Sequence, residues 1–433
     1  MRIFSVFLAW AWACLAQAAL PIEHWTTSTG ARVYFVESHE LPMLDVSVEF
    51  AAGSSRDTPK KSGLAGMTLR LMRLGVQGMD ENAISEQLAD VGAALGMSFD
   101  VDRAGYSLRT LSKKEFREAA LAIMTKVLSQ PSFPEAVLTR EVQHAVSEMK
   151  ESEIKPETAA GRAFSKMVFG DHPYQLRSSG ETDTLPALAR ADLMEFYGKH
   201  FHASAAVVAL MGDVTRAQAA LIAEQLTSGL GRGTKPAPIP PVNMILKGEE
   251  RFISHPSAQA HILIGGPGVK RADPDYFPLL VGNYILGGGG FNSRLTLEVR
   301  EKRGLTYSVY SALSPYREAG AFQIGLQTRR DQAKQALQVV RDTLKTFLTQ
   351  GPTAAELEGA KQNLIGGFPL RIDTSRKILE YLAVIGFYDL PLDYLEQFPE
   401  RISQVTLQQV KEAFARRVDP SRLATVVVGG ENN

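Results

Sequence analysis

Cysteine is almost absent from this chain. The single cysteine among 433 residues, Cys14, lies in an apolar N-terminal stretch that follows a positive start at Arg2 and ends in the small-x-small pattern of residues 16–18. These are the features of a cleaved secretory signal. We therefore expect residues 1–18 to be removed and the mature protein to be periplasmic or otherwise exported. Without cysteine, the mature protein has neither a disulfide nor a thiolate metal site, so any metal ligands must be His, Asp or Glu.

An excess of one charge and a long apolar run are also absent. The chain has 47 basic and 47 acidic residues, a formal net charge of zero and no long run of lysine or arginine. Nucleic acid is therefore not an expected partner, because phosphate binding needs a concentrated basic surface. The apolar core of the signal sequence is shorter than the ~20 residues that a membrane span requires. We expect no membrane anchor.

Apolar residues, by contrast, make up 45% of the chain, which is ample for real hydrophobic cores. At ~100–200 residues per domain, the length predicts at least two domains. Residues 231–243 include closely spaced prolines at positions 236, 238, 240 and 241, a composition that excludes helix and favours an extended linker. We therefore predict an N-terminal α/β domain at residues 19–230 and a C-terminal α/β domain at residues 244–433.

Each predicted domain closes with the same pattern. The stretch "DLMEFYGKHFHASAAVVALMGDV" ends the first and "QVKEAFARRVDPSRLATVVVGGEN" ends the second, and both read as a helix, a short turn and a buried apolar strand. An offset of 217 residues aligns Gly212 with Gly429 and Tyr197 with Phe414. The sequence therefore predicts one internal duplication, with a period too long for a solenoid.

Strand and helix patterns follow a similar order in both halves. The first half predicts strands at residues 31–38, 44–54, 92–101 and 103–111, and helices near 62–74, 80–91, 113–129 and 134–152. The second half predicts strands at residues 260–269, 306–313 and 319–328, and helices near 274–286, 293–303, 331–350 and 353–366. Strand groups that alternate with helix pairs indicate α+β sheets with helices packed largely on one face.

Several co-linear stretches carry a family resemblance, namely residues 51–66, 169–175, 196–213 and 285–313. Through them the chain resembles the pitrilysin-type zinc peptidases, or inverzincins, whose relatives include the mitochondrial processing peptidase. The resemblance implies two homologous α/β halves, each a mostly antiparallel sheet with helices on one face, in a LuxS/processing-peptidase-like metallohydrolase fold. Active members hold zinc and a general base on an inverted H-x-x-E-H helix.

The resemblance places the two zinc-binding histidines of that motif at Gly66 and Arg70 and the general base at Leu69. Residues i and i+4 share a helix face, so two imidazoles there grip one ion while a carboxylate at i+3 activates its water. Glycine offers no ligand, leucine accepts no proton, and arginine puts a permanent positive charge where a dication belongs. We expect this chain to bind no metal and to be inactive alone.

The family's third ligand, a glutamate on a later helix, corresponds to Glu148, and Glu141 corresponds to another carboxylate common in the family. A buried carboxylate without a partner is costly, so we expect Arg70 to pair with Glu148. A plainer interpretation makes the 62–74 helix a core element with leucine or methionine at positions 64, 67, 71 and 74 on its buried stripe. Gly66 in a helix interior costs ~1 kcal/mol relative to alanine, and the sequence shows no reason for it.

A second constellation is intact. Arg300 is expected in the last turns of a helix that stops at Gly304, and Tyr307 at the start of the next strand, seven residues after Arg300. In active relatives the equivalent pair reaches the zinc site, holds the substrate carbonyl and stabilises the oxyanion. Guanidinium and phenol suit that role because both donate hydrogen bonds to developing negative charge. The alternative is a helix-end cation and a half-buried strand aromatic.

Three further patterns have competing interpretations. The run Gly287–Gly290 lacks the Gly-Lys-Ser/Thr ending of a phosphate loop, so it is expected to end one helix before Asn292 or Ser293 caps the next. Residues 96–108 match a segment that forms an edge strand beside the zinc helix in active relatives, where it can add a substrate peptide; a simple hairpin is the alternative. The histidines at 200 and 202 read as surface residues, and that at 172 as a turn residue.

A chain that has lost the zinc half and kept the Arg/Tyr half has the features of a complementary subunit. We expect a zinc-free member of a heterodimeric metallopeptidase, in which Arg300 and Tyr307 complete the zinc site of an H-x-x-E-H catalytic partner that cleaves peptides or unfolded segments. Zinc would then belong to the partner alone. The alternative is a catalytically inactive peptide-binding or scaffold protein of the same fold. A metal-independent hydrolase has little support, since no G-x-S-x-G motif is present.

Overall fold

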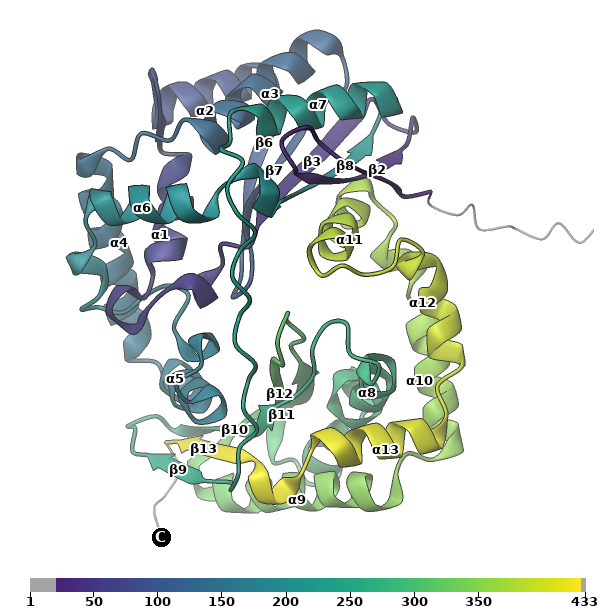
Figure 1. Cartoon of the computed structure of the whole chain (residues 1–433). Helices are drawn as coiled ribbons and strands as arrows, with labels where there is room; N and C mark the ends of the chain where they lie inside the picture. The colour runs from purple at the N-terminus through teal and green to yellow at the C-terminus, as the bar shows by residue number, and fades with distance from the viewer. Residues whose placement is uncertain (1–20, 430–433) are drawn as a thin grey trace, which may run out of the picture.

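The computed structural model describes residues 21–429, so the predicted signal peptide at residues 1–18 lies outside the described part. The chain forms two halves, each built on one sheet (Figure 1). Strands of the first sheet are β1 (Glu23–Thr26), β2 (Arg32–Glu37), β3 (Met43–Phe50), β6 (Ala94–Phe99), β7 (Ala104–Leu111) and β8 (Ala206–Gly212). Strands of the second are β9 (Glu250–Ile253), β10 (Gln259–Pro267), β11 (Thr306–Leu313), β12 (Ala321–Arg329) and β13 (Ala424–Val428).

The helices alternate with these strands. The first half contributes α1 (Leu64–Met72), α2 (Glu81–Asp90), α3 (Lys114–Ser129), α4 (Glu135–Glu153), α5 (Pro156–Phe169), α6 (Arg190–His200) and α7 (Arg216–Ser228). The second contributes α8 (Tyr276–Asn283), α9 (Ala333–Gln350), α10 (Ala354–Gly366), α11 (Ser375–Phe387), α12 (Tyr394–Ser403) and α13 (Leu407–Arg417). A two-residue hairpin, β4 (Gly75–Val76) and β5 (Met79–Asp80), completes the strands. The predicted α+β class is confirmed.

The two sheets share an order of five strands, and the first sheet has β1 as an additional edge strand. The first runs β1-β2-β8-β3-β7-β6, and the second, in the matching direction, runs β9-β13-β10-β12-β11. In each, one parallel pair (β2 with β8, β9 with β13) adjoins antiparallel pairs. At the predicted offset of 217 residues, α6 at 190–200 falls on α13 at 407–417. The duplication predicted from the two half-endings is therefore confirmed, and it extends to the five strands that the sheets share.

Each half gives one helix to the other half's sheet, an exchange that the sequence did not reveal. Helix α11 packs across β8, β3 and β2 of the first sheet, and α5 packs across β10 and β13 of the second (Figure 1). The close approach of α11 depends on Gly386, where a Cβ atom would lie 2.5 Å from the Tyr34 ring and 2.6 Å from Val207. Each sheet is thus covered on both faces, once by its own helices and once by the exchanged helix.

Strand alternation divides the cores accordingly. In the first sheet, Phe35 and Val208 join the core beneath the helices of their own half, whereas the neighbouring Tyr34 and Val207 join the core of the second half through α11. Successive side chains of a strand point to opposite faces, so a two-sided buried strand feeds two cores. This explains why β8 is buried at every position.

A buried carboxylate ties the halves together. Asp102, 1% exposed, accepts hydrogen bonds from the Tyr174 hydroxyl at 2.7 Å, the Arg317 backbone N–H at 2.7 Å and the Tyr388 hydroxyl at 3.1 Å. Tyr174 belongs to the first half, and the other two donors to the second. Burial raises the pKa of Asp102, and the three donors oppose that rise.

Replacing Asp102 with alanine is expected to lower the free energy of unfolding by about 2–3 kcal/mol, because buried donors from both halves lose their acceptor. Urea unfolding monitored by circular dichroism measures the loss. Asp102→Asn keeps an acceptor oxygen and is the matched control, with a smaller expected loss. Equal stability of the alanine variant and the parent chain would contradict this role.

The proline-rich segment at residues 231–243 contains no helix or strand and runs between the halves (Figure 1). It is fastened to the first half, because Arg56 Nη1 donates to the Ala237 carbonyl at 2.7 Å and His172 Nε2 bonds the Pro240 carbonyl at 2.8 Å. The predicted domain limits at 19–230 and 244–433 stay a prediction. Over residues 21–429, no helix combines the length and apolar character needed to cross a bilayer.

Candidate functional site

The N-terminus of helix α1, which carries the degenerate zinc motif, is capped by a carboxylate from the preceding loop. Gly63 has φ +92°, a left-handed conformation that glycine adopts without strain, and the Asp57 carboxylate accepts from the N–H groups of Gly63 and Ala65, both at 2.8 Å. Burial raises the pKa of Asp57 to about 7 against the pull of these two donors. The helix is therefore held in place by its own first turn and the preceding loop.

Close packing explains Gly66. A Cβ atom at this position would lie 3.1 Å from the Ser178 carbonyl oxygen and 3.2 Å from the Phe99 ring. Both contacts are tighter than ordinary side-chain packing, so a larger residue requires the wall to move. Glycine here is a packing requirement, which the sequence alone did not show.

Leu69 and Arg70 have diverged in different ways. Leu69 is fully buried in the core of the first half, as a structural residue would be. The Arg70 Nε atom lies 2.5 Å from Glu141 Oε2, and the Glu141 side chain is 8% exposed. Glu141 also pairs with Arg140 at 3.0 Å. The predicted pairing of Arg70 with Glu148 is wrong, because the buried carboxylate that needs a cation is Glu141.

Glu148 is exposed to solvent, so its charge does not need a partner to offset burial. Its side chain is 67% exposed, and the His144 ring lies 3.8 Å away, one helical turn earlier. Glu141 and Glu148 are seven residues apart on α4 and therefore share a face, so their spacing did not distinguish which one Arg70 meets.

A cavity of about 370 Å³ occupies the place of the former zinc pocket, between α1, α4 and β6. Gly66, Arg70 and Glu148 line it, together with three methionines and a phenylalanine, Met67, Met97, Met149 and Phe99. Across residues 21–429, no group of three or more His, Cys, Asp or Glu side chains is placed to hold a metal ion. The predicted stripe on α1 is largely correct, since Leu64, Met67 and Leu71 are buried, whereas Leu74 lies beyond the helix and is half-buried.

The Arg300 and Tyr307 pair lies elsewhere, in the second half. Arg300 is in a π-helical segment (Thr296–Glu301), a form that occurs often at functional sites. Its guanidinium lies 4.9 Å from the centre of the Phe291 ring and 3.5 Å from Glu301. The segment ends at Glu301, before the predicted stop at Gly304, which has φ +61° and donates its N–H to the Arg300 carbonyl at 2.8 Å.

Tyr307 lies on β11 within a bulge. Thr306 pairs with Thr328 and Val309 with Leu326, so one extra residue lies on the β11 side. The Thr306 hydroxyl stabilises the bulge by accepting from the Ser308 N–H at 3.1 Å. Bulges redirect side chains, and the Tyr307 side chain here is 89% exposed. The interpretation of Tyr307 as a half-buried strand aromatic is therefore wrong.

Neither Arg300 nor Tyr307 lines the cavity beside α1. The structure therefore does not bring the Arg/Tyr pair and the degenerate zinc positions together in one site of this chain. Both side chains are instead available at the surface, where they can donate to a group supplied from outside.

The segment at residues 96–108 forms a hairpin of β6 and β7, and β6 is the last strand of its sheet. Both interpretations of this segment thus describe part of the result. Met97 and Phe99 of β6 line the small cavity, so the unpaired edge lies beside the former zinc position.

The histidines are mostly structural. His172 accepts from the Tyr174 N–H at 3.1 Å through Nδ1, which confirms its predicted turn role. The expectation of surface positions for His200 and His202 is wrong, since they are 8% and 5% exposed. The His200 ring packs 4.5 Å from the Phe196 ring, one turn earlier on the buried face of α6.

His200 is expected to make the fold acid-sensitive. Burial, with help from nearby cations, lowers its pKa to about 4, so the folded protein keeps the ring neutral while the unfolded chain takes a proton near pH 6.5. Its contribution is complete above about pH 6.5 and is lost as the pH falls toward 4. When the pH falls from 7 to 4.5, the His200→Gln variant should lose about 1–2 kcal/mol less unfolding free energy than the parent protein, as measured by urea titrations at each pH. Parallel pH curves for parent and variant would contradict this.

Comparisons with known proteins identify relatives of this chain in a single peptidase family. Residues 32–180 match the family described as insulinase (peptidase family M16), and residues 187–364 match the peptidase M16 inactive domain. The chain is 24% identical over 401 residues to the "Non-peptidase homolog YmxG" of Helicobacter pylori, which covers 92% of each chain.

Two solved structures have the same fold. The M16 peptidase inactive domain from Pseudomonas fluorescens superposes with a TM-score of 0.92 at 37% identity, over 95% of this chain and 98% of that one. A protease from Helicobacter pylori superposes with a TM-score of 0.86 at 17% identity, over 94% and 99% of the two chains. These matches show that the chain belongs to the M16 peptidase family, and because α1 carries glycine, leucine and arginine at the three motif positions, it is a noncatalytic member.

Proposed function

We propose that this protein is the zinc-free subunit of a heterodimeric, exported metallopeptidase. Arg300 and Tyr307 would donate hydrogen bonds to the substrate at the zinc site of a catalytic H-x-x-E-H partner. The observation that carries the proposal is the bulge in β11, which presents the Tyr307 phenol 89% exposed and with no bonding partner in its own chain among residues 21–429. Because the Tyr307 side chain is exposed, it does not contribute to the hydrophobic core of its own half.

Arg300 supports the same role. Phe291 and Glu301 hold its guanidinium near the surface without burying it, since the side chain remains 37% exposed. Preorganised donors stabilise developing negative charge more effectively than mobile ones, and guanidinium and phenol are both suited to an oxyanion. Zinc would be bound by the partner, where it would supply the activated water; this chain contributes only hydrogen-bond donors.

Reconstitution tests the proposal. The purified chain is mixed with an H-x-x-E-H member of the M16 family from the same organism, and cleavage of a quenched fluorescent peptide is followed with each protein alone and with both. The expected result is cleavage only, or far faster, in the mixture, together with a stable complex in analytical ultracentrifugation. A complex without any gain in cleavage would point to the second function below.

The second candidate is a catalytically inactive peptide-binding or scaffold protein. The observation that favours it is the unpaired edge of β6 beside a cavity lined by Met97 and Phe99. A peptide can add to such an edge through main-chain hydrogen bonds, and its side chains can enter the cavity. This function requires peptide binding by the chain alone and no dependence on Arg300 or Tyr307.

A further inference from the structure

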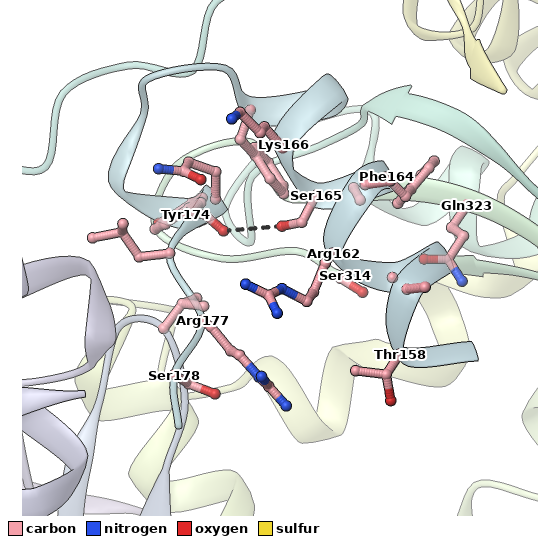
Figure 2. Close-up of a pocket in the computed structure, with 18 of the residues that line it drawn as sticks. Thr158, Arg162, Phe164, Ser165, Lys166, Tyr174, Arg177, Ser178, Ser314 and Gln323 are labelled. Carbon is pink, nitrogen blue, oxygen red and sulfur yellow. Dashed lines mark hydrogen bonds between the residues drawn. The ribbon is translucent and has the colours of Figure 1, made fainter. Parts of the chain in front are cut away.

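A cavity between the two halves plays no part in the sites described above. Its volume is about 840 Å³, within the range of ligand sites. Helix α5 and the segment 174–178 form one side, and strands of the second sheet form the other (Figure 2). Because both halves contribute walls, the cavity exists only in the assembled fold.

The cavity is rich in positive charge. Arg162, Lys166, Arg177 and Arg251 line it, whereas Glu181 is the only carboxylate among the lining residues. Glu181 pairs with Arg162 at 2.5 Å, and Glu153, which does not line the cavity, pairs with Arg162 at 2.9 Å and with Arg177 at 3.6 Å. Even with both carboxylates counted, cations remain in excess.

Several of these donors are unused. The Nη1 atom of Arg177 is buried and makes no hydrogen bond, since Glu153 Oε1 is 3.6 Å away, while its Nη2 atom donates to Ser152 at 3.0 Å. Lys166 and Arg251 form no ion pair with any residue of the described range 21–429, and both are exposed. Figure 2 shows the Arg162 and Arg177 side chains close together in the cavity, where both guanidinium groups pair with Glu153. A guanidinium with a free N–H group suits a carboxylate.

The cavity continues toward the former zinc pocket. Arg177 and Ser178 line both the 840 Å³ cavity and the 370 Å³ cavity beside α1, so the two share a wall.

We propose that the cavity between the halves binds the carboxylate groups of an extended peptide, with Arg177 and Arg251 as contacts. The inference rests on the peptide-binding part of the proposed function and adds a substrate class, peptides with acidic side chains or a free C-terminus beyond the residues at β6. Neutral donors from Ser178 and Ser314 complete a polar wall beside the aromatic Tyr316.

Fluorescence anisotropy with the full chain tests the site. Three labelled decapeptides are identical except at two positions and at the C-terminus. The first has glutamate at both positions and an amidated C-terminus, the second has glutamine at both and a free C-terminus, and the third has glutamine at both and an amidated C-terminus. The first or the second is expected to bind about tenfold more tightly than the third, with a preference that weakens as salt is added. Whichever of the two gains affinity identifies the source of the carboxylate.

Variants separate the site from general charge effects. Arg251→Gln and Arg177→Gln should each reduce that preference about five- to tenfold, and Lys334→Gln, an exposed lysine on α9 outside the cavity, should leave it unchanged. Arg251 is exposed, so its variant should keep the parent melting temperature if Arg177→Gln disturbs the fold. Equal affinity for all three peptides, or a preference untouched by both variants, overturns the carboxylate site and leaves the proposed function standing. If no peptide binds, the inference fails with its premise, whereas cleavage by the reconstituted pair still reports on Arg300 and Tyr307.

Discussion

Tyr307→Phe is expected to reduce peptide cleavage by the reconstituted pair about 10²- to 10³-fold in kcat, with little change in the stability of this chain. The substitution removes one hydroxyl from a ring that is 89% exposed, so no packing is lost. A donor that acts mainly in the transition state affects kcat more than KM. Steady-state kinetics on a quenched peptide with a saturating amount of variant subunit measures the effect.

Controls for this prediction lie close by. Tyr310 is on the same strand, and its hydroxyl accepts from Gln323 Nε2 at 2.7 Å, so Tyr310→Phe should leave kcat unchanged. Arg300→Ala is expected to match the loss seen in Tyr307→Phe, while Arg303→Ala should not, because Arg303 pairs with Glu298 at 2.7 Å. If Tyr307→Phe and Tyr310→Phe behave alike, the exposed phenol has no role in the chemistry.

Rebuilding the zinc motif is expected to fail. The triple variant Gly66→His, Leu69→Glu, Arg70→His should lose roughly 3–5 kcal/mol of unfolding free energy and bind no stoichiometric zinc. Leu69 is fully buried, so a glutamate there is desolvated, and loss of Arg70 removes the closest cation from Glu141. At position 66, the Cβ atom alone already crowds Ser178 and Phe99.

Urea unfolding and elemental analysis of the purified triple variant provide the measurements. Leu69→Glu alone should account for most of the lost stability, and Arg70→His alone, at a side chain that is 38% exposed, should cost less. A stable triple variant with one zinc per chain would show that α1 still has the environment of a metal helix.

Local patterns predicted much of the fold. The predicted strand at residues 306–313 coincides with β11, and the half-endings predicted the duplication that relates the two sheets. The exchange of α5 and α11 was not predictable in this way, because an amphipathic helix shows that one face is buried but not which half of the chain buries it.

The candidate site shows the same limit. Residue identities at 66, 69 and 70 led to the expectation that α1 binds no zinc, and the pattern around Arg300 and Tyr307 predicted a helical segment followed by a strand, as in the structure. The partner of Arg70, the contacts of Gly66 and the walls of the cavity between the halves all depend on residues distant in sequence. Such contacts follow from the packing of whole elements, and neither periodicity nor spacing encodes them.

The reciprocal placement of α5 and α11 makes the two halves interdependent beyond their covalent connection. A protease cut within residues 231–243 should leave a nicked protein that stays associated, since each fragment still inserts a helix against the other's sheet. Conversely, either fragment produced alone would expose an apolar sheet face and the apolar side of its exchanged helix. We expect it to aggregate until the other fragment is added.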